Sequence, residues 1–173
     1  PFTRMMAGPA DYTPGVFAFE NPIIPGTRVH STLSNQLALF VVLYSPLQMA
    51  CDKIENYEKH PAEFQFLRDV PCDWEQSRLL DGNIGQYVVM ARQDRHSEDW
   101  YIGAITNEEP REITIPLSFL GDGEWIATIY ADAPDADWKT NPYATTIETR
   151  PVSATEEIKI HLASGGGCAI RFE

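Results

Sequence analysis

The sequence is poor in several features that define common functional classes. Basic residues are scarce: 13 Lys and Arg stand against 25 Asp and Glu over 173 residues, which gives a formal net charge of −12. A protein that binds nucleic acid neutralises phosphates with clustered basic side chains. The few lysines here are scattered, so the composition excludes nucleic acid as a partner.

Cysteine is scarce as well. Cys51, Cys72 and Cys168 lie far apart in the chain and form no Cys-x-x-Cys pair. Neither a disulfide framework nor a zinc or redox motif is indicated by this spacing. We expect three buried or half-buried thiols.

Long hydrophobic runs are missing too. The longest apolar stretch is the eight residues from Leu37 to Tyr44, whereas a membrane-spanning helix needs roughly 18 or more. We therefore expect a buried element here and no membrane partner. The sequence shows no signal-peptide pattern and begins at Pro1 without Met, so we expect a mature end or a fragment.

What is present is a packed globular composition, with 43% hydrophobic residues, whose pattern changes near residue 72. The first part mixes helical and strand-like stretches. The β-branched pair Val41 and Val42 leaves a strand open as an alternative for the end of its main helix. The expected elements are an apolar strand before Gly8, a helix from Ser31 to Tyr44 capped by Ser31 or Thr32, a short strand from Leu47 to Asp52, and a helical stretch from Glu55 to Leu67 that restarts at Pro61.

The second part, residues 78–173, indicates an all-β structure. Apolar runs of strand length alternate with turn residues, including a turn at Asp81-Gly82, and this series is typical of an antiparallel sandwich. This part is long enough to hold its own core, whereas residues 1–71 are not. The expected strands are Ile84 to Met90, Trp100 to Thr106, Glu112 to Leu120, Trp125 to Ala131, Tyr143 to Thr149, Glu156 to Leu162 and Cys168 to Phe172.

Ordered blocks along almost the whole chain resemble glycoside hydrolase family 97. The blocks include Pro1-Phe2-Thr3-Arg4, Ala7 to Gly15, Ser31-Thr32-Leu33, Ser45 to Ala50, Glu55-Asn56-Tyr57, Asp69-Val70-Pro71, Trp100 to Gly103 and Gly165-Gly166-Gly167. Enzymes of this family are α-glucosidases or α-galactosidases built from an N-terminal β-sandwich, a (β/α)8 catalytic barrel and a C-terminal β-sandwich. The resemblance implies an α/β fragment, the last units of the barrel, at residues 1–71, followed by an all-β antiparallel sandwich at residues 72–173.

The resemblance also implies what this chain lacks. Glycoside hydrolysis uses two carboxyl groups held across the sugar. In the family these groups, and the glutamates that hold a calcium ion, precede the block that begins at Pro1. We therefore expect no catalytic residue and no metal ligand here, with calcium belonging to the full-length enzyme. The sandwich is expected to support the barrel or to mediate oligomerisation.

The expected partners follow from the same resemblance. They are an oligosaccharide or α-glycoside substrate bound through the full enzyme, the missing N-terminal and barrel portion, and a second copy of the chain. A periplasmic or secreted location is implied likewise. Without the rest of the barrel, Leu37, Phe40, Val41 and Leu43 are expected to form an exposed apolar patch that drives self-association or pairing with the missing portion.

Four residues are expected to contact the substrate. Active sites of such barrels form at the C-terminal ends of the strands. Arg4, Asp11 and Tyr12 follow the first expected strand, and Asp52 ends the next. Arg4 can hold a carboxylate in place and Asp11 can accept a hydrogen bond from a sugar hydroxyl. Alternatively, Asp11 sets an Asx-type turn before Thr13-Pro14-Gly15.

A second hypothesis is an autonomous carbohydrate-binding sandwich. Trp138 lies outside the strand patterns and offers a ring on which a sugar can stack. Beside it, Asp132, Asp135 and Asp137 form an acidic loop with oxygens suited to a hard cation, although their spacing does not match an EF-hand.

Overall fold

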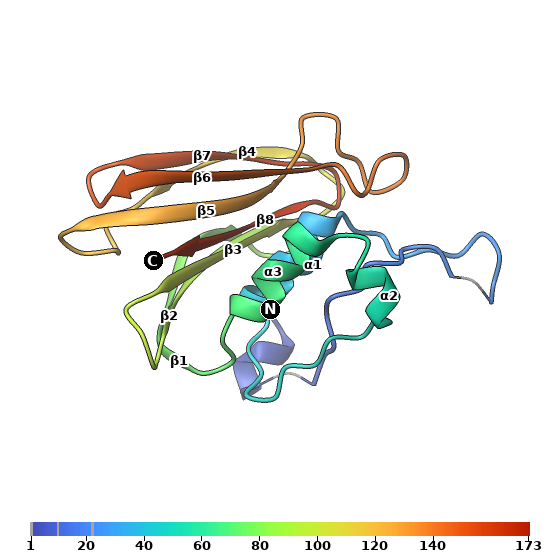
Figure 1. Cartoon of the computed structure of the whole chain (residues 1–173), viewed down its shortest axis with the longest axis horizontal. Helices are drawn as coiled ribbons and strands as arrows, with labels where there is room; N and C mark the ends of the chain where they lie inside the picture. The colour runs from blue at the N-terminus through green and yellow to red at the C-terminus, as the bar shows by residue number, and fades with distance from the viewer. Residues whose placement is uncertain (1, 10, 22) are drawn as a thin grey trace.

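The computed structural model describes residues 2–9, 11–21 and 23–173, with the side chains of Arg4 and Met6 left out. A six-stranded antiparallel sheet lies between a two-stranded sheet on one face and helices on the other (Figure 1). The elements are η1 (Arg4–Ala7), α1 (Leu33–Val42), α2 (Ile54–Tyr57), α3 (Pro61–Asp69), β1 (Trp74–Asn83), β2 (Tyr87–Asp94), β3 (Trp100–Thr106), β4 (Arg111–Pro116), β5 (Glu124–Asp132), β6 (Thr145–Ser153), β7 (Glu157–Leu162) and β8 (Gly167–Phe172).

The two sheets enclose the first hydrophobic core. The large sheet has the strand order β1-β2-β3-β8-β5-β6, and the small sheet pairs β4 with β7. Ile113 and Ile115 of β4 alternate with exposed residues and point toward Ile102 and Ile170 of the central strands. The antiparallel β architecture expected for this part is therefore confirmed.

The second core lies on the other face of the large sheet, beneath α1. This helix crosses β3 and β8, where glycines allow its backbone to touch the sheet. A Cβ atom on Gly103 would lie 2.6 Å from the carbonyl oxygen of Ala38, and one on Gly167 would lie 2.6 Å from the Cα of Asn35. Leu37 and Val41 are fully buried in this contact. The helix and the sheet therefore form one packed unit.

Buried charges of opposite sign flank the two ends of α1. At its N-terminus the Asp132 carboxylate lies beside Thr32 and Ser34, and its Oδ2 accepts hydrogen bonds from the N–H groups of Ala163 and Gly167 at 2.9 and 2.8 Å. Burial raises the pKa of Asp132, and these donors oppose the rise only in part. The negative charge is placed where the helix dipole stabilises it.

At the C-terminus of α1 the buried charge is positive. Arg92 on β2 donates from Nε to the carbonyl oxygen of Val41 at 2.6 Å, and its guanidinium lies over the rings of Tyr44 and Trp74 at 5.7 and 6.0 Å. Burial lowers the pKa of Arg92. Arg92 satisfies one of the last carbonyl groups of the helix and complements the negative end of its dipole.

The structure tests three expectations about α1: its N-terminal cap, the helical state of its end and its exposed patch. The Thr32 cap is confirmed, because Thr32 Oγ1 accepts a hydrogen bond from the Asn35 N–H at 3.2 Å, and Val41 and Val42 are helical. The apolar patch expected at Leu37, Phe40, Val41 and Leu43 is wrong: the first three are buried and Leu43 is partly buried. The large sheet supplies the neighbours that residues 1–71 lack.

The two strands expected in the first part are absent from the described residues. Arg4–Ala7 form a 3-10 helix, and residues 47–52 have no strand pairing. Leu47 is 73% exposed and Met49 46% exposed. A parallel strand exists only through hydrogen bonds to neighbouring strands, and none lies beside these segments here.

Further corrections concern the second part. Strand β1 was not expected, and Asp81-Gly82 lies within it rather than in a turn; the chain turns instead at residues 84–86, where Gly85 has φ of +78°. Cys51 and Cys72 are exposed rather than buried, because they lie in irregular segments, while Cys168 on β8 is buried. Within the described ranges, no helix is long and apolar enough to cross a membrane.

The helix–sheet contact predicts a strong effect of Gly103→Ala. The added methyl group must displace the backbone of α1, so we expect the free energy of unfolding to fall by about 2 to 3 kcal/mol. Gly82→Ala is the matched control, because its Cβ would meet the Tyr87 carbonyl at 3.2 Å on the exposed edge strand. A change within about 1 kcal/mol is expected there. Urea unfolding of both variants measures the difference, and equal effects would contradict the close approach.

Candidate functional site

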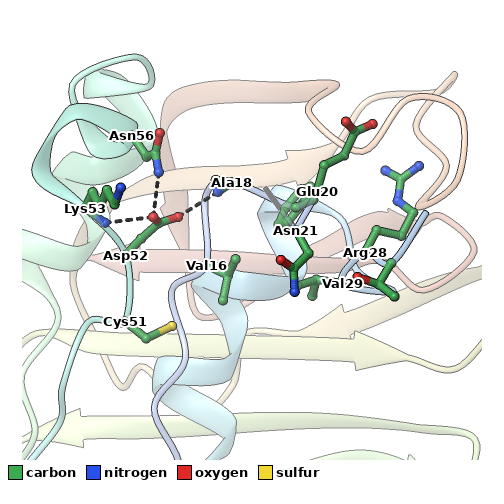
Figure 2. A pocket seen from close by; sticks show the side chains of 12 residues that line it. Val16, Ala18, Glu20, Asn21, Arg28, Val29, Cys51, Asp52, Lys53 and Asn56 are labelled. Carbon is green, nitrogen blue, oxygen red and sulfur yellow. Dashed lines mark hydrogen bonds between the residues drawn. The ribbon is translucent and has the colours of Figure 1, made fainter. Parts of the chain in front are cut away.

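A cleft of about 610 Å³ lies between the segment that follows Gly15 and the segment around Asp52 (Figure 2). Both segments precede helices in the chain: the first is followed by a loop that leads to α1, and the second leads into α2 and α3. The lining residues are Val16, Ala18, Phe19, Glu20, Asn21, Thr27, Arg28, Val29, Cys51, Asp52, Lys53 and Asn56.

One wall of the cleft is the segment of residues 15–19, which belongs to no assigned strand. Its five consecutive N–H groups donate to side-chain oxygens instead. The bonds run from Gly15 and Val16 to Gln36 Oε1 at 3.1 Å each, from Phe17 and Ala18 to Asp52 Oδ2 at 2.7 and 2.6 Å, and from Phe19 to the Tyr143 hydroxyl at 3.1 Å. Side chains from α1, from the opposite wall and from the sandwich therefore fix this backbone.

Asp52 is the acceptor that joins the two walls. Its Oδ2 accepts the hydrogen bonds from Phe17 and Ala18. Its Oδ1 accepts hydrogen bonds from the Lys53 N–H at 2.7 Å and from Asn56 Nδ2 at 2.6 Å (Figure 2). Burial alone would raise the pKa of Asp52, but these four donors outweigh it and lower the pKa. The carboxylate is therefore ionised and saturated at neutral pH.

A tyrosine backs the same junction. The Tyr57 hydroxyl accepts a hydrogen bond from the Asp52 N–H and donates one to the Gly15 carbonyl, both at 2.9 Å. Burial raises the pKa of Tyr57 to about 12, so it stays a neutral donor. Asp52 and Tyr57 together tie the start of α2 to the segment 15–18.

The four residues predicted to contact substrate do not converge on this cleft. Asp52 lines it, while Asp11 is exposed on the extended segment outside it. Tyr12 is 50% exposed, and burial of its remaining surface raises its pKa, with Cys51 nearby. The side chain of Arg4 lies outside the described part of the structure. Substrate contact by these residues stays a prediction.

The structure adds Gln36 and Tyr143, which the sequence did not single out for the site. Gln36 is a buried amide in the apolar run of α1, a position where a polar side chain needs partners. That signal was present in the sequence. Tyr143 meets Phe19 across more than 120 residues of chain, and no local pattern predicts such a contact.

Trp138, the ring of the alternative sugar-stacking surface, packs against other residues and is partly buried. Trp138 lies 4.1 Å from the His30 ring, centroid to centroid, and Lys139 Nζ lies 4.9 Å from the tryptophan centroid. A Cβ on Gly165 would also lie 3.0 Å from the ring. These contacts cover the indole, so the structure does not favour Trp138 as a platform.

The acidic loop does not gather its carboxylates. Asp132 points inward to α1, Asp135 accepts from Asn141 Nδ2 at 2.9 Å, and Asp137 Oδ1 accepts from the N–H groups of residues 139 and 140 at 2.9 Å each. Among the described residues, no three His, Cys, Asp or Glu side chains are grouped to hold a metal. Calcium takes about six to eight oxygen ligands, and the described carboxylates of this loop do not converge to supply them.

Comparison with known proteins places these features in a family context. Residues 73–173 match the family domain described as Glycosyl-hydrolase 97 C-terminal, oligomerisation. A retaining alpha-galactosidase of Bacteroides thetaiotaomicron is 37% identical over 100% of this chain, and a probable retaining alpha-galactosidase of Streptomyces bingchenggensis is 30% identical over 98% of it.

A solved structure shows the same fold. The glycoside hydrolase family 97 enzyme from Pseudoalteromonas sp. strain K8, in complex with panose, is 48% identical with a TM-score of 0.93 over 98% of this chain. The chain spans 27% of that protein and 26% and 24% of the two curated relatives.

The saturated Asp52 carboxylate predicts an acid-sensitive contribution to stability. Because its pKa is lowered on folding, this contribution is present above the unfolded pKa of about 3.9 and is lost as the pH falls through the folded value. Asp52→Asn should remove that acid-dependent loss in urea unfolding measured from pH 7 to pH 3. Asp52→Ala, which leaves the N–H groups of Phe17 and Ala18 without their acceptor, should cost about 2 kcal/mol at pH 7.

Asp11→Asn is the control, since Asp11 is an exposed carboxylate on the same extended segment. It should change the unfolding free energy by less than about 0.5 kcal/mol. If Asp52→Asn keeps the full acid-dependent loss of the wild type, the assignment of that loss to Asp52 is wrong.

Proposed function

This chain belongs to glycoside hydrolase family 97 and carries its C-terminal oligomerisation domain at residues 73–173, and we propose that it serves a longer α-glycosidase as the end of the catalytic barrel and the sandwich that follows. The observation that carries the proposal is similarity over the whole chain, including residues 1–72, which precede the family domain. A periplasmic or secreted location is part of the proposal and rests on the family resemblance.

The arrangement of residues 1–71 supports the end of a barrel. The segments at residues 11–19 and 47–52 each precede a helix in the chain, and the Cys51 N–H donates to the Pro14 carbonyl at 3.3 Å between them. This order is that of two successive βα units. The exposed side chains of Leu47 and Met49 are those that preceding barrel strands would cover.

We propose that the cleft is part of the substrate-binding face of such a barrel. The loops that lead from strands into helices form the active-site face of a barrel, and both walls of the cleft precede helices in the chain. We infer that this face receives an α-linked galactoside or glucoside. Contact of Arg4, Asp11 and Tyr12 with the sugar belongs to the proposal, while Asp52, with all four donors in place, shapes the wall of the cleft.

The acid and base of the reaction are proposed to come from the portion upstream. A general acid must hold a proton near neutral pH, whereas the lowered pKa of Asp52 keeps that carboxylate ionised. The calcium ion expected for the full enzyme is likewise assigned upstream, because the described residues offer no fitting ligand set.

Hydrolysis of p-nitrophenyl α-galactoside and α-glucoside tests the proposal. A protein in which this chain is joined to its upstream barrel should release nitrophenol, and the 173-residue chain alone should not. Both are assayed with and without calcium. An inactive extended protein would contradict the proposal. Activity of the 173-residue chain would contradict the upstream assignment and make Asp11 and Asp52 the first residues to substitute.

Self-association is the second expectation, and its basis is now the family domain rather than an apolar patch on α1. We expect the 173-residue chain to sediment as a dimer or larger species at micromolar concentration, because residues 73–173 form the domain described as oligomerising. Analytical ultracentrifugation over a concentration series measures this. A single monomeric species at every concentration would contradict it.

A further inference from the structure

The loop between β5 and β6, residues 133–144, belongs to the sandwich but contacts the other part of the chain. It touches the segment that runs from the cleft wall to the start of α1, at the right of Figure 1. The contacts are the Phe19 N–H to the Tyr143 hydroxyl at 3.1 Å, the Leu33 N–H to the Pro142 carbonyl at 2.8 Å, the Arg28 guanidinium to the Lys139 carbonyl, and the His30 ring on Trp138 at 4.1 Å.

Tyr143 of this loop contacts two segments of the first part of the chain, one of which lines the cleft. Its ring stacks on Phe19 at 4.9 Å and 13° and on His60 at 5.1 Å and 10°, centroid to centroid. Phe19 lines the cleft from the segment before α1, and His60 precedes α3. One side chain of the sandwich therefore links both loops that lead into the helices.

The β5–β6 loop contacts α1 at its N-terminal end. Leu33 is the first residue of α1, so the Pro142 carbonyl lies at the N-terminal end of that helix. The N-terminal ends of barrel helices lie on the same face as the C-terminal ends of the strands, where substrate binds. The sandwich thus reaches the substrate face through this loop.

We propose that the β5–β6 loop is part of the substrate site of the full enzyme, with Tyr143 as a positioning residue that fixes the cleft wall against which an α-linked glycoside binds. This inference rests on the proposed function. It assigns the sandwich a role in substrate recognition in addition to oligomerisation.

Tyr143 is not needed to hold the sandwich together. It belongs to neither hydrophobic core, and its side chain is 40% exposed. Its hydroxyl accepts a hydrogen bond from the Phe19 N–H, and its ring stacks on the rings of Phe19 and His60. Substitution is therefore expected to loosen the wall while leaving the fold intact, which allows the two effects to be separated.

Limited trypsin digestion of the 173-residue chain tests the positioning role without enzymatic activity. Cleavage after Arg28 reports on the segment that Tyr143 holds, and cleavage after Arg95, in the β2–β3 turn, is the internal reference. Relative to the reference, Tyr143→Ala should speed cleavage after Arg28 about tenfold, and Tyr143→Phe, which keeps the ring stack, about threefold. The control is Tyr87→Phe, which removes a tyrosine hydroxyl that bonds Asp81 in the large sheet. It should leave the ratio of the two cleavage rates unchanged.

The second measurement uses the protein joined to its upstream barrel. Tyr143→Ala should raise KM for the p-nitrophenyl glycoside that it cleaves about fivefold, with kcat within about twofold. Tyr143→Phe should recover part of the loss, and the sedimentation of both variants should match the wild type. A purely oligomeric role would alter sedimentation and leave KM unchanged.

The outcomes separate the two proposals. A cleavage ratio within twofold of wild type in both Tyr143 variants overturns the inference, as does an unchanged KM in an active extended protein. If the extended wild type has no glycosidase activity, the proposed function fails, and the role of the loop in substrate recognition fails with it. The digestion then reports only whether Tyr143 holds the segment.

Discussion

The contact between α1 and the large sheet is the constraint on which the rest of the structure depends. A helix usually meets a sheet through side chains, but here glycines at positions 103 and 167 let the helix backbone itself touch β3 and β8. This approach leaves no space for adjustment, so the helix has one position relative to the sandwich. Asp132 and Arg92 then fix its two ends with charges that match the dipole.

Because α1 is fixed, its side chains can act as anchors for a segment that has no sheet of its own. Gln36 holds the N–H groups of Gly15 and Val16. Position 15 favours glycine because its φ is +89° and because a Cβ there would lie 3.1 Å from the Phe40 ring. Asp52 and Tyr143 hold the next three N–H groups. The wall of the cleft is therefore determined by the helix, by the opposite loop and by the sandwich together.

Buried elements of this structure could be predicted from the sequence, whereas exposed ones could not. Strand β3 was predicted at its observed bounds, Trp100–Thr106, because a strand buried on both faces leaves a continuous apolar run. Strand β1 was missed, because an edge strand exposed at almost every position shows no alternation. The partner of α1 was missed for a different reason: an all-round apolar helix shows that it is buried, but not against what. At the site, Asp52 was predicted because it ends an expected strand. Tyr143 was not predicted, because its role rests on a contact with Phe19, which is distant in the sequence.

Two carboxylates of this chain shape the structure around the cleft and the start of α1. Asp52 has a lowered pKa and contributes stability that is lost as the pH falls through its folded value. Asp132 has a raised pKa, so its charge opposes folding near neutrality and this penalty is relieved as the pH falls through its folded value. The two carboxylates therefore act in opposite directions on the acid side. Asp52 holds the cleft wall at Phe17 and Ala18, and Asp132 lies at the start of α1, the helix from which Gln36 holds Gly15 and Val16. The wall of the cleft therefore depends both on the position of α1 and on the opposite loop.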